Sequence, residues 1–477
     1  MIYQIEKQVA LKLKNYFEQF DFIDKVVVFG SRARHDCNPK SDIDLCIYSI
    51  AMSDREFTKL KYEIDELPIL YKIDVVHFEK VNDALKENIL RDEKLLFVKK
   101  VKLGEVITFI NGFAFKSKNF STNGIPIVRI GNLVNDNIDL SNVVYYQEDN
   151  SFNNYEIFKN DILIAMSGAT TGKIAYNNLS DKLYLNQRIG VIRVKDTTIS
   201  SYIFYFLKTN KDNLLSLASG SAQPNLSANL IKNIEIPLPS LEKQKQIAKT
   251  LDKAQELITL RKNSIKKLDE LSKSIFIDMF GDPFKNTNKY KTKSIKEIGK
   301  VQTGNTPPRK DLNNYGDFIE WIKSDNIDRN KLYLDTAKEY LSEQGYEKGR
   351  IVPTKSLLFT CIAGSMLSIG NLAIVNREVA FNQQINSITP NEDNIYYLYF
   401  LFKMMKRYFE ENSTKSMKIM INKSTFEELV FPIAPIDLQN NFAKKIEKIQ
   451  EQKALYEKEL EKLQYNFDAL LQKSFES

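Results

Sequence analysis

Histidine and cysteine are scarce in this chain of 477 residues. The three cysteines, Cys37, Cys46 and Cys361, have neither the spacing of a zinc site nor the number expected for a disulfide framework, which indicates a reducing compartment. Both histidines, His35 and His77, precede residue 101. The stretch from residue 101 onward therefore cannot use histidine for acid–base catalysis, for metal binding or in a Ser–His mechanism.

Long hydrophobic runs are missing as well. No apolar stretch approaches the roughly 18 residues that a membrane-spanning helix needs. The first residues carry charges at helical spacing instead of the basic start and apolar block of a signal peptide. We therefore expect no membrane partner and a cytoplasmic location.

Size and composition indicate several globular domains. The chain is longer than the roughly 250–300 residues at which a single hydrophobic core stops growing. Its 43% hydrophobic and 27% charged residues are typical of folded domains and not of disordered segments. We predict two or three domains.

The positive charge is unevenly distributed along the chain. Residues 1–100 contain 17 Lys and Arg against 18 Asp and Glu, so residues 101–477 hold the remaining 51 against 43 and carry a net charge of +8. A basic excess of this kind suits a polyanionic partner such as DNA. A solvated lysine-rich surface is the alternative interpretation of the same count.

The first hundred residues have the pattern of an α/β domain. Apolar residues recur at helical spacing over residues 2–20. Apolar runs at 25–29, 43–48 and 73–78 predict three strands, separated by polar or helical segments.

A glycine-serine turn and three aspartates accompany these predicted strands. Gly30 and Ser31 end the first strand, where the missing side chain lets backbone amides and the serine hydroxyl approach a phosphate. Asp42 and Asp44 are two residues apart and therefore point to one face, while Asp74 supplies a third carboxylate from the next strand. Such carboxylates suit divalent cations that bridge nucleotide phosphates, and in a two-metal displacement Asp74 would help to deprotonate the attacking hydroxyl.

This constellation resembles the minimal nucleotidyltransferases of the DNA polymerase beta superfamily, over about residues 1–100. The resemblance implies an enzyme that uses Mg²⁺ and a nucleoside triphosphate, with catalytic and metal-binding roles for Asp42, Asp44 and Asp74. The residues assigned to nucleotide binding are Gly30, Ser31, Arg32 and Arg34, the two arginines being additional candidates for phosphate contacts. A correctly folded but inactive domain would contain the same residues.

From residue 101 the sequence repeats itself with an offset of about 195 residues. One copy covers residues 103–283 and the other about 295–477. Matching segments are 161–165 and 356–360, 186–187 and 382–383, and 237–244 and 432–439. The offset drifts by a residue or more, which predicts related folds with loop insertions.

Each copy ends in a predicted long helix. Apolar residues alternate at steps of three and four over residues 247–279, and the same heptad phase, shifted by 195, covers residues 442–474. A 3.5-residue repeat sustained over four to five heptads favours a two-helix coiled coil. The alternative is two unrelated amphipathic helices that pack on their own domains.

Residues 101–477 resemble the specificity subunit of type I restriction-modification systems. In the first copy the resemblance rests on residues 103–106, 124–129, 163–172, 186–187, 236–244 and 279–283. In the second copy it rests on residues 298–299, 321–326, 363–364, 382–383 and 432–439. The resemblance implies two target recognition domains that each read half of a split site in double-stranded DNA. It also implies antiparallel helices that set the gap between them and dock two methyltransferase subunits.

Catalytic motifs are absent from the repeated region. We find no methylation motif, no cofactor-binding glycine-rich turn and no P-loop there. The repeated region is therefore expected to bind DNA without a cofactor. Methylation and ATP-driven cleavage would come from methyltransferase and restriction (ATPase-nuclease) subunits.

Amide and basic side chains in loop-prone stretches are the candidates for DNA contacts. Arg pairs with guanine, Asn and Gln pair with adenine, and Lys mostly neutralises phosphate. The candidates are Arg129, Lys173, Asn186, Gln187, Arg188, Lys323, Asn382 and Gln383. For each amide, a turn side chain that satisfies backbone groups is the competing interpretation.

Together these patterns predict an α+β multidomain chain. The predicted parts are a nucleotidyltransferase-like α/β domain at 1–100, mixed α/β target recognition domains at 101–240 and 284–435, and helices at 241–283 and 436–477 that pair as an antiparallel coiled coil. The favoured function is a specificity subunit with an appended nucleotidyltransferase. The alternative is a nucleotidyl-transferring antitoxin-like or regulatory enzyme whose C-terminal region anchors it on DNA or a partner.

Overall fold

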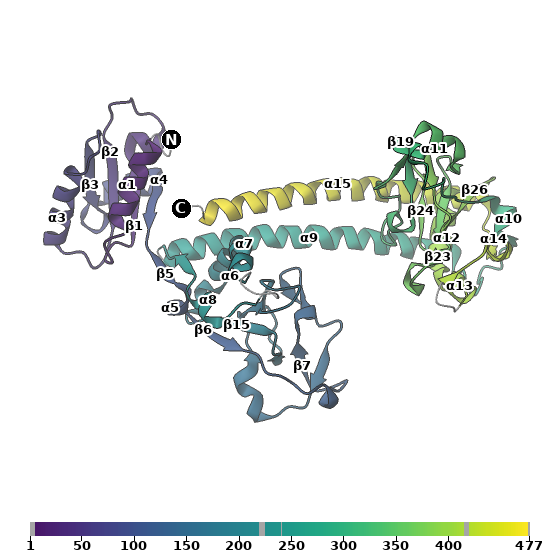
Figure 1. Cartoon of the computed structure of the whole chain (residues 1–477), viewed down its shortest axis with the longest axis horizontal. Coiled ribbons are helices and arrows are strands. Elements are labelled where there is room, and N and C mark those ends of the chain that lie inside the picture. The colour runs from purple at the N-terminus through teal and green to yellow at the C-terminus, as the bar shows by residue number, and fades with distance from the viewer. Residues whose placement is uncertain (1–4, 219–224, 240, 415–418, 476–477) are drawn as a thin grey trace. The chain divides into compact units, whose positions relative to one another are not determined.

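The computed structural model describes residues 5–218, 225–239, 241–414 and 419–475 (Figure 1). Ser240, in the predicted strand end 237–244, and residues 2–4 of the first predicted helix lie outside these ranges. The chain divides into two compact units, Met1–Ile258 with Lys462–Ser477, and Thr259–Glu461. No helix within the described ranges is long and apolar enough to cross a membrane.

The N-terminal domain is a four-stranded sheet with helices on both faces. Its strands, in the order β3-β2-β1-β4, are β1 (Lys25–Phe29), β2 (Ile43–Tyr48), β3 (Ile73–His77) and β4 (Lys94–Val98). Its helices are α1 (Lys7–Phe17), α2 (Gly30–Arg34), α3 (Asp54–Asp65) and α4 (Asp83–Asp92). Val26 and Val28 pack with Leu13 of α1, whereas Val27 packs with Ile89 of α4, as the period of two along a strand requires. The three predicted strands are confirmed, and β4 is an addition that the sequence does not predict.

The first predicted recognition region, residues 101–240, contains two larger sheets and the strand pair β5–β16. The strand orders of the two sheets are β6-β15-β12-β13-β9-β8 and β10-β7-β14-β11. The strands are β5 (Lys100–Lys102), β6 (Ile107–Asn111), β7 (Ile125–Val128), β8 (Leu133–Val134), β9 (Asn137–Ile138), β10 (Val144–Tyr146), β11 (Glu156–Ile157), β12 (Ile162–Ala165), β13 (Ile174–Tyr176), β14 (Leu183–Leu185), β15 (Ile189–Val194) and β16 (Glu235–Pro237). The short helices are α5 (Leu103–Val106), α6 (Ser200–Thr209), α7 (Lys211–Ala218) and α8 (Ala228–Lys232).

The second recognition region repeats this arrangement. Its strands are β17 (Thr292–Ser294), β18 (Gly299–Thr303), β19 (Tyr315–Ile322), β20 (Tyr340–Leu341), β21 (Ile351–Val352), β22 (Leu357–Thr360), β23 (Ile362–Ala363), β24 (Leu372–Ile374), β25 (Val379–Phe381), β26 (Ile385–Pro390), β27 (Ile419–Met420) and β28 (Val430–Pro432). Its helices are α10 (Ile295–Ile298), α11 (Glu343–Lys348), α12 (Ile395–Met404), α13 (Lys406–Glu411) and α14 (Lys423–Glu428). The sheets β18-β26-β22-β24 and β20-β19-β25-β21 match β6-β15-β12-β13 and β10-β7-β14-β11 strand for strand. The predicted duplication is therefore confirmed.

A helix of 40 residues follows each recognition region, as the sequence predicts. These helices are α9 (Leu241–Phe280) and α15 (Ile436–Phe475). In the second unit they run antiparallel, because Arg261 of α9 pairs with Glu459 of α15 at 2.7 Å and the later Asp269 pairs with the earlier Lys453 at 2.6 Å. The predicted α+β multidomain fold with paired long helices is thereby confirmed.

The heptad pattern holds along most of both helices. The ten predicted heptad positions of α9 are all buried or half-buried: residues 247, 251, 254, 258, 261, 265, 268, 272, 275 and 279. In α15 the prediction is wrong at Leu470, which is 38% exposed, while Leu471 is only 7% exposed. After the buried Phe467 the apolar stripe therefore advances by four residues instead of three, because a straight helix of 3.6 residues per turn drifts away from a 3.5-residue repeat. Knobs-into-holes packing of the two helices stays a prediction.

A buried lysine lies where the second recognition region meets the two long helices. Lys403 of α12 lines a cavity of about 20 Å³ with Asp269 and Lys273 of α9 and Lys453 of α15. Its Nζ donates a hydrogen bond to the Tyr399 hydroxyl at 2.9 Å. Burial, followed by the charge of Lys273, lowers the pKa of Lys403 to about 8. Its ammonium form is therefore disfavoured in the folded protein.

We expect Lys403→Met to raise the free energy of unfolding of the second unit by about 1–2 kcal/mol at pH 7, since it removes an ammonium that folding takes out of water. Between about pH 8 and the ordinary value of 10.5, the unfolded state binds more protons than the folded one, so the wild type gains stability as the pH rises. The advantage of the variant is therefore largest below pH 8 and fades toward pH 10.5. Urea denaturation across this range measures it, with the exposed Lys445→Met of α15 as the control. Equal effects of both substitutions at every pH would contradict the expectation.

Candidate functional site

The three predicted aspartates lie together at the ends of two parallel strands. Asp44 of β2 is directly opposite Asp74 of β3 in the sheet register, and Asp42 immediately precedes β2. The ammonium of Lys72 lies 2.9 Å from an Asp74 carboxylate oxygen and 3.6 Å from an Asp42 oxygen. Lys72 is a site residue that the sequence interpretation missed, although its position two residues before Asp74 places it on the same face.

Gly30 determines where the Asp44 carboxylate can lie. Gly30 has φ +69°, and a Cβ added to it would lie 2.3 Å from Asp44 Oδ2. No side chain other than hydrogen fits this contact unless Asp44 moves, and positive φ is itself unfavourable for other residues. The glycine therefore acts on the carboxylate directly, in addition to its predicted role toward phosphate.

Negative charge accumulates around Asp44. Its burial, followed by the charges of Asp74 and Asp42, raises the pKa of Asp44 above its ordinary value, while Arg34 and Lys72 oppose the rise. The hydrogen bond to Asp74 and the nearby carboxylate charges raise the pKa of Lys72. The site thus balances three carboxylates with local cations and holds a further positive charge favourably.

The two arginines assigned to phosphate contacts are engaged by the protein itself. Arg32 is only 2% exposed, and its guanidinium donates to the backbone oxygens of Ser41 at 2.6 Å and Asp42 at 3.2 Å. It therefore positions the segment that carries Asp42. Arg34 forms ion pairs with Asp92 at 2.8 Å and Asp36 at 3.0 Å, and the hydrogen bonds from Arg91 and Arg34 lower the pKa of Asp92 to about 2. Ser31 follows Gly30 in α2 and is half-buried.

The donor set of this site fits a hard divalent cation, because carboxylate oxygens are the ligands that Mg²⁺ prefers. The arrangement is not a closed metal cage, since no group of three His, Cys, Asp or Glu residues in the described part of the chain is close enough to hold a metal ion. Lys72 contacts the oxygens of Asp42 and Asp74 that a cation would use.

In each recognition region, parallel strand ends bring the candidate DNA-binding residues together. Arg129 follows β7 and Asn186 follows β14, and these two strands pair in parallel. The backbone N–H of Asn186 donates a hydrogen bond to the Val128 carbonyl at 3.2 Å. In the second region Lys323 follows β19 and Asn382 follows the parallel strand β25.

A glycine contacts each of these turns. A Cβ added to Gly112 would lie 1.9 Å from the Asn186 carbonyl oxygen, and one added to Gly304 would lie 2.2 Å from that of Asn382. The sequence interpretation did not identify these two glycines. Their spacing of 192 residues, close to the repeat offset, is the signal that could have found them.

The first region leaves most of its candidates accessible. Gln187 and Arg188 are exposed, whereas Arg129, Lys173 and Asn186 are half-buried. The Arg129 Nε is buried and has no hydrogen-bond partner in the described part of the chain.

The second region engages its candidates in contacts within the protein. Lys323 forms an ion pair with Glu339, and Gln383 accepts a hydrogen bond from Thr306. Asn382 is 6% exposed and its amide donates to Gln384 at 3.0 Å. Asn382 is thus held as a turn amide.

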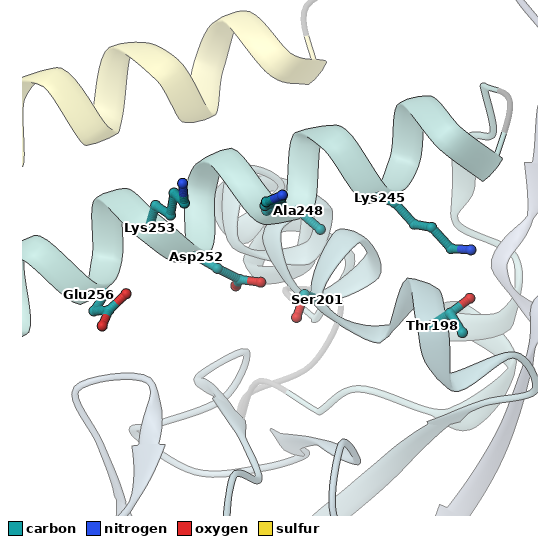
Figure 2. A pocket seen from close by; sticks show the side chains of 8 residues that line it. Thr198, Ser201, Lys245, Ala248, Asp252, Lys253 and Glu256 are labelled. Atoms are coloured by element: carbon teal, nitrogen blue, oxygen red, sulfur yellow. The ribbon is translucent and has the colours of Figure 1, made fainter.

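A groove of about 290 Å³ lies between α6 and the first turns of α9 (Figure 2). Lys245, Lys249 and Lys253 line it together with Asp252 and Glu256, so cations and carboxylates are mixed. The Asp252 carboxylate accepts a hydrogen bond from the Tyr205 hydroxyl of α6 at 2.9 Å, and burial raises the pKa of Asp252. We attribute the groove to the packing of α6 on α9 and assign it no ligand.

Sequence comparisons identify relatives for both parts of the chain. Residues 97–270 and 287–465 match the family described as "Type I restriction modification DNA specificity domain", and residues 11–102 match "Polymerase beta, Nucleotidyltransferase". The chain is 24% identical over 332 residues to the type I restriction enzyme MjaVIII specificity subunit of Methanocaldococcus jannaschii, covering 64% of this chain and 76% of the relative. It is 21% identical over 383 residues to the EcoBI specificity subunit of Escherichia coli, covering 73% and 78%. A crystal structure of the S subunit of a type I restriction-modification system from M. genitalium aligns with a TM-score of 0.49 and 16% identity, over 80% of this chain and 96% of that one.

We expect Gly30→Ala to displace the Asp44 carboxylate and to destabilise the N-terminal domain by about 1–3 kcal/mol, because the new Cβ overlaps Asp44 Oδ2 at an unfavourable φ. Gly131→Ala is the matched control, since a Cβ at Gly131 meets no atom within 4 Å. Thermal unfolding and the carboxyl carbon chemical shift of Asp44 report the two effects. An unchanged Asp44 signal in Gly30→Ala would refute the contact.

We also expect Lys72→Met to raise the pKa of Asp44 further, because it removes one of the two cations that oppose the rise. A pH titration followed by carboxyl carbon chemical shifts measures this change. Lys61→Met, an exposed substitution on α3, serves as the control. A pKa of Asp44 that falls or stays constant in Lys72→Met would show that the ammonium does not act on this carboxylate.

Proposed function

Because the chain belongs to the type I restriction-modification DNA specificity family, we propose that it reads a bipartite site in double-stranded DNA, one half with each recognition region. The observation that carries this proposal is the repeated strand-end arrangement. Arg129 and Asn186 in one region, and Lys323 and Asn382 in the other, follow equivalent parallel strands of equivalent sheets. The net charge of +8 over residues 101–477 supports a polyanionic partner.

The proposal includes docking of two methyltransferase subunits on the long helices and assembly with restriction subunits in the cytoplasm. Apolar side chains that the chain itself leaves exposed support a partner there. On α9, Leu257 is 52%, Leu260 is 54% and Leu271 is 46% exposed, and on α15, Leu455 is 58% exposed. Large exposed apolar patches are typical of surfaces that another protein covers.

For the N-terminal domain we propose transfer of a nucleotide from a nucleoside triphosphate to a hydroxyl group, in which the new P–O bond forms at the α-phosphate and pyrophosphate leaves. Asp42, Asp44 and Asp74 would have to draw closer together than they lie in this structure to hold Mg²⁺, which would neutralise the charge that develops on the phosphates. Asp74 would help to take the proton of the attacking hydroxyl, and Gly30 and Ser31 would position the phosphates. The Lys72 ammonium would have to leave Asp42 and Asp74 when the cation enters. The fit between Gly30 and Asp44 supports an intact site over a degenerate one.

The close packing of this carboxylate site also supports a second candidate function, in which nucleotide transfer is the main activity of the chain. In that case the chain is an antitoxin-like or regulatory nucleotidyltransferase whose C-terminal region anchors it on DNA or on a partner. The two functions are compatible, and they differ in whether the chain recognises a defined DNA sequence.

We expect the full chain with methyltransferase subunits to select a bipartite sequence from random duplex DNA, with affinity that falls steeply as salt increases. Selection followed by sequencing reveals the site, and a titration of binding against salt concentration gives the slope. Recovery of no preferred sequence would remove the DNA-reading proposal.

We expect the full chain with Mg²⁺ and labelled nucleoside triphosphate to transfer label to a protein or RNA acceptor. Asp42→Ala and Asp44→Ala should each abolish transfer, because both remove a cation ligand. Asp83→Ala, whose side chain is fully exposed on α4, should transfer label as the wild type does. Retained transfer in the two site variants would show that the assigned carboxylates are not the active site.

A further inference from the structure

A polar groove of about 440 Å³ opens beside the strand-end turn of the first recognition region. The polar residues that line it are Asn111, Ser167, Gln187, Asn225, Ser227 and Asn229. They come from the end of β6, the end of β12, the turn after β14 and the start of α8, four places far apart in the sequence. Four of the six side chains are carboxamides, and neither an acidic nor a basic side chain lines the groove among the described residues.

The four carboxamides are exposed and available to a ligand. None of the side chains of Asn111, Gln187, Asn225 and Asn229 forms a hydrogen bond with another residue in the described ranges of the chain. Amides with a structural role in the same region behave differently. Asn132 donates to the carbonyls of Asp139 and Asn142, and Asn177 donates to that of Phe158.

Backbone contacts fix the segments that carry these amides. The Met166 amide donates to the Arg188 carbonyl at 2.9 Å, and the Leu226 amide donates to the Met166 carbonyl at 2.8 Å. Ser167 and Asn225 form an antiparallel bridge. The turn of Gln187, the end of β12 and the segment before α8 are therefore linked into one surface, so that binding a ligand would order the amide side chains but not their backbone.

We propose that this groove reads adenine in one half of the DNA site, a step that rests on the DNA-reading function proposed above. A carboxamide can donate a hydrogen bond to N7 of adenine and accept one from its amino group at the same time. Asn and Gln are therefore the side chains that pair with adenine in the major groove. The groove lacks the arginine that a guanine contact favours. Arg188 and Lys173 lie next to the same turns, where positive side chains meet phosphate.

The second recognition region does not repeat the amide set. Asn111 pairs with Gly190 in the β6–β15 register, and its counterpart Thr303 pairs with Asn386 in the β18–β26 register and donates to that side chain at 2.8 Å. The bridge between Ser167 and Asn225 has its counterpart in Ala363 and Ile419, which are apolar. Adenine readout by this groove therefore belongs to one half of the site only.

The test compares base preferences of full-length variants in complex with methyltransferase subunits. In Gln187→Ala and Asn225→Ala, we expect the preference for adenine at one or two positions of a single half-site to fall roughly 5- to 150-fold, the range of a lost bidentate contact. The other half-site and the salt dependence should not change. Asn153→Ala, an exposed amide outside the groove, should keep the wild-type preferences.

Substitutions of the basic residues beside the groove distinguish base readout from electrostatic attraction to phosphate. Lys173→Ala and Arg188→Ala should weaken binding to all sequences alike and reduce the salt slope. Two results would overturn the inference if the wild type still selects a bipartite site. One is an unchanged adenine preference in the amide variants, and the other is a loss of their binding affinity that is equal for all sequences. If the wild type selects no site at all, the proposed DNA-reading function itself fails.

Discussion

Close backbone approach at three glycines is the constraint on which both kinds of candidate site depend. At Gly30 the missing side chain makes room for the Asp44 carboxylate, and at Gly112 and Gly304 it makes room for the carbonyls of Asn186 and Asn382. In each case the hypothetical Cβ lies under 2.5 Å from the site residue, a distance that requires movement of the backbone or of the half-buried Asp44 carboxylate. The sheets bring these residues to common strand ends, and the glycines let them come into contact there.

The two duplicated regions share the glycine contact and the backbone arrangement around it, but they differ in the side chains that line the sites. The order of the four shared strands in each large sheet, their register and the glycine contact are the same in both copies. The side chains that the scaffold presents differ, with exposed carboxamides around Gln187 in one copy and the ion pair of Lys323 with Glu339 in the other. A scaffold held by backbone contacts tolerates such exchanges, because the lining side chains contribute little to its stability. Two copies can therefore present different chemistry to the two halves of a site without a change of fold.

Features with a local or periodic signal were predictable from the sequence. The β-branched strands, the spacing of Asp42 and Asp44 and the heptads of α9 each arise from a few neighbouring residues, and the structure places them as expected. Features that depend on distant segments were not predictable. The contact of Lys72 with Asp42 depends on the pairing of β2 with β3, and the buried state of Arg32 depends on the carbonyl of Ser41. The groove of Gln187 joins four separate segments, so no single stretch of sequence contains its signal.

The two parts of the chain differ in how their charges would meet the phosphates of the proposed substrates. The first hundred residues have nearly balanced charges, and their carboxylate site is compensated locally by Lys72 and Arg34. Such a site repels a polyanion unless the phosphate arrives with its own cation, as a nucleoside triphosphate with bound Mg²⁺ does. The excess of +8 in residues 101–477 would instead neutralise the DNA backbone in the proposed function. The proposed functions thus assign DNA to the basic region and leave the aspartates to a substrate that carries a divalent cation.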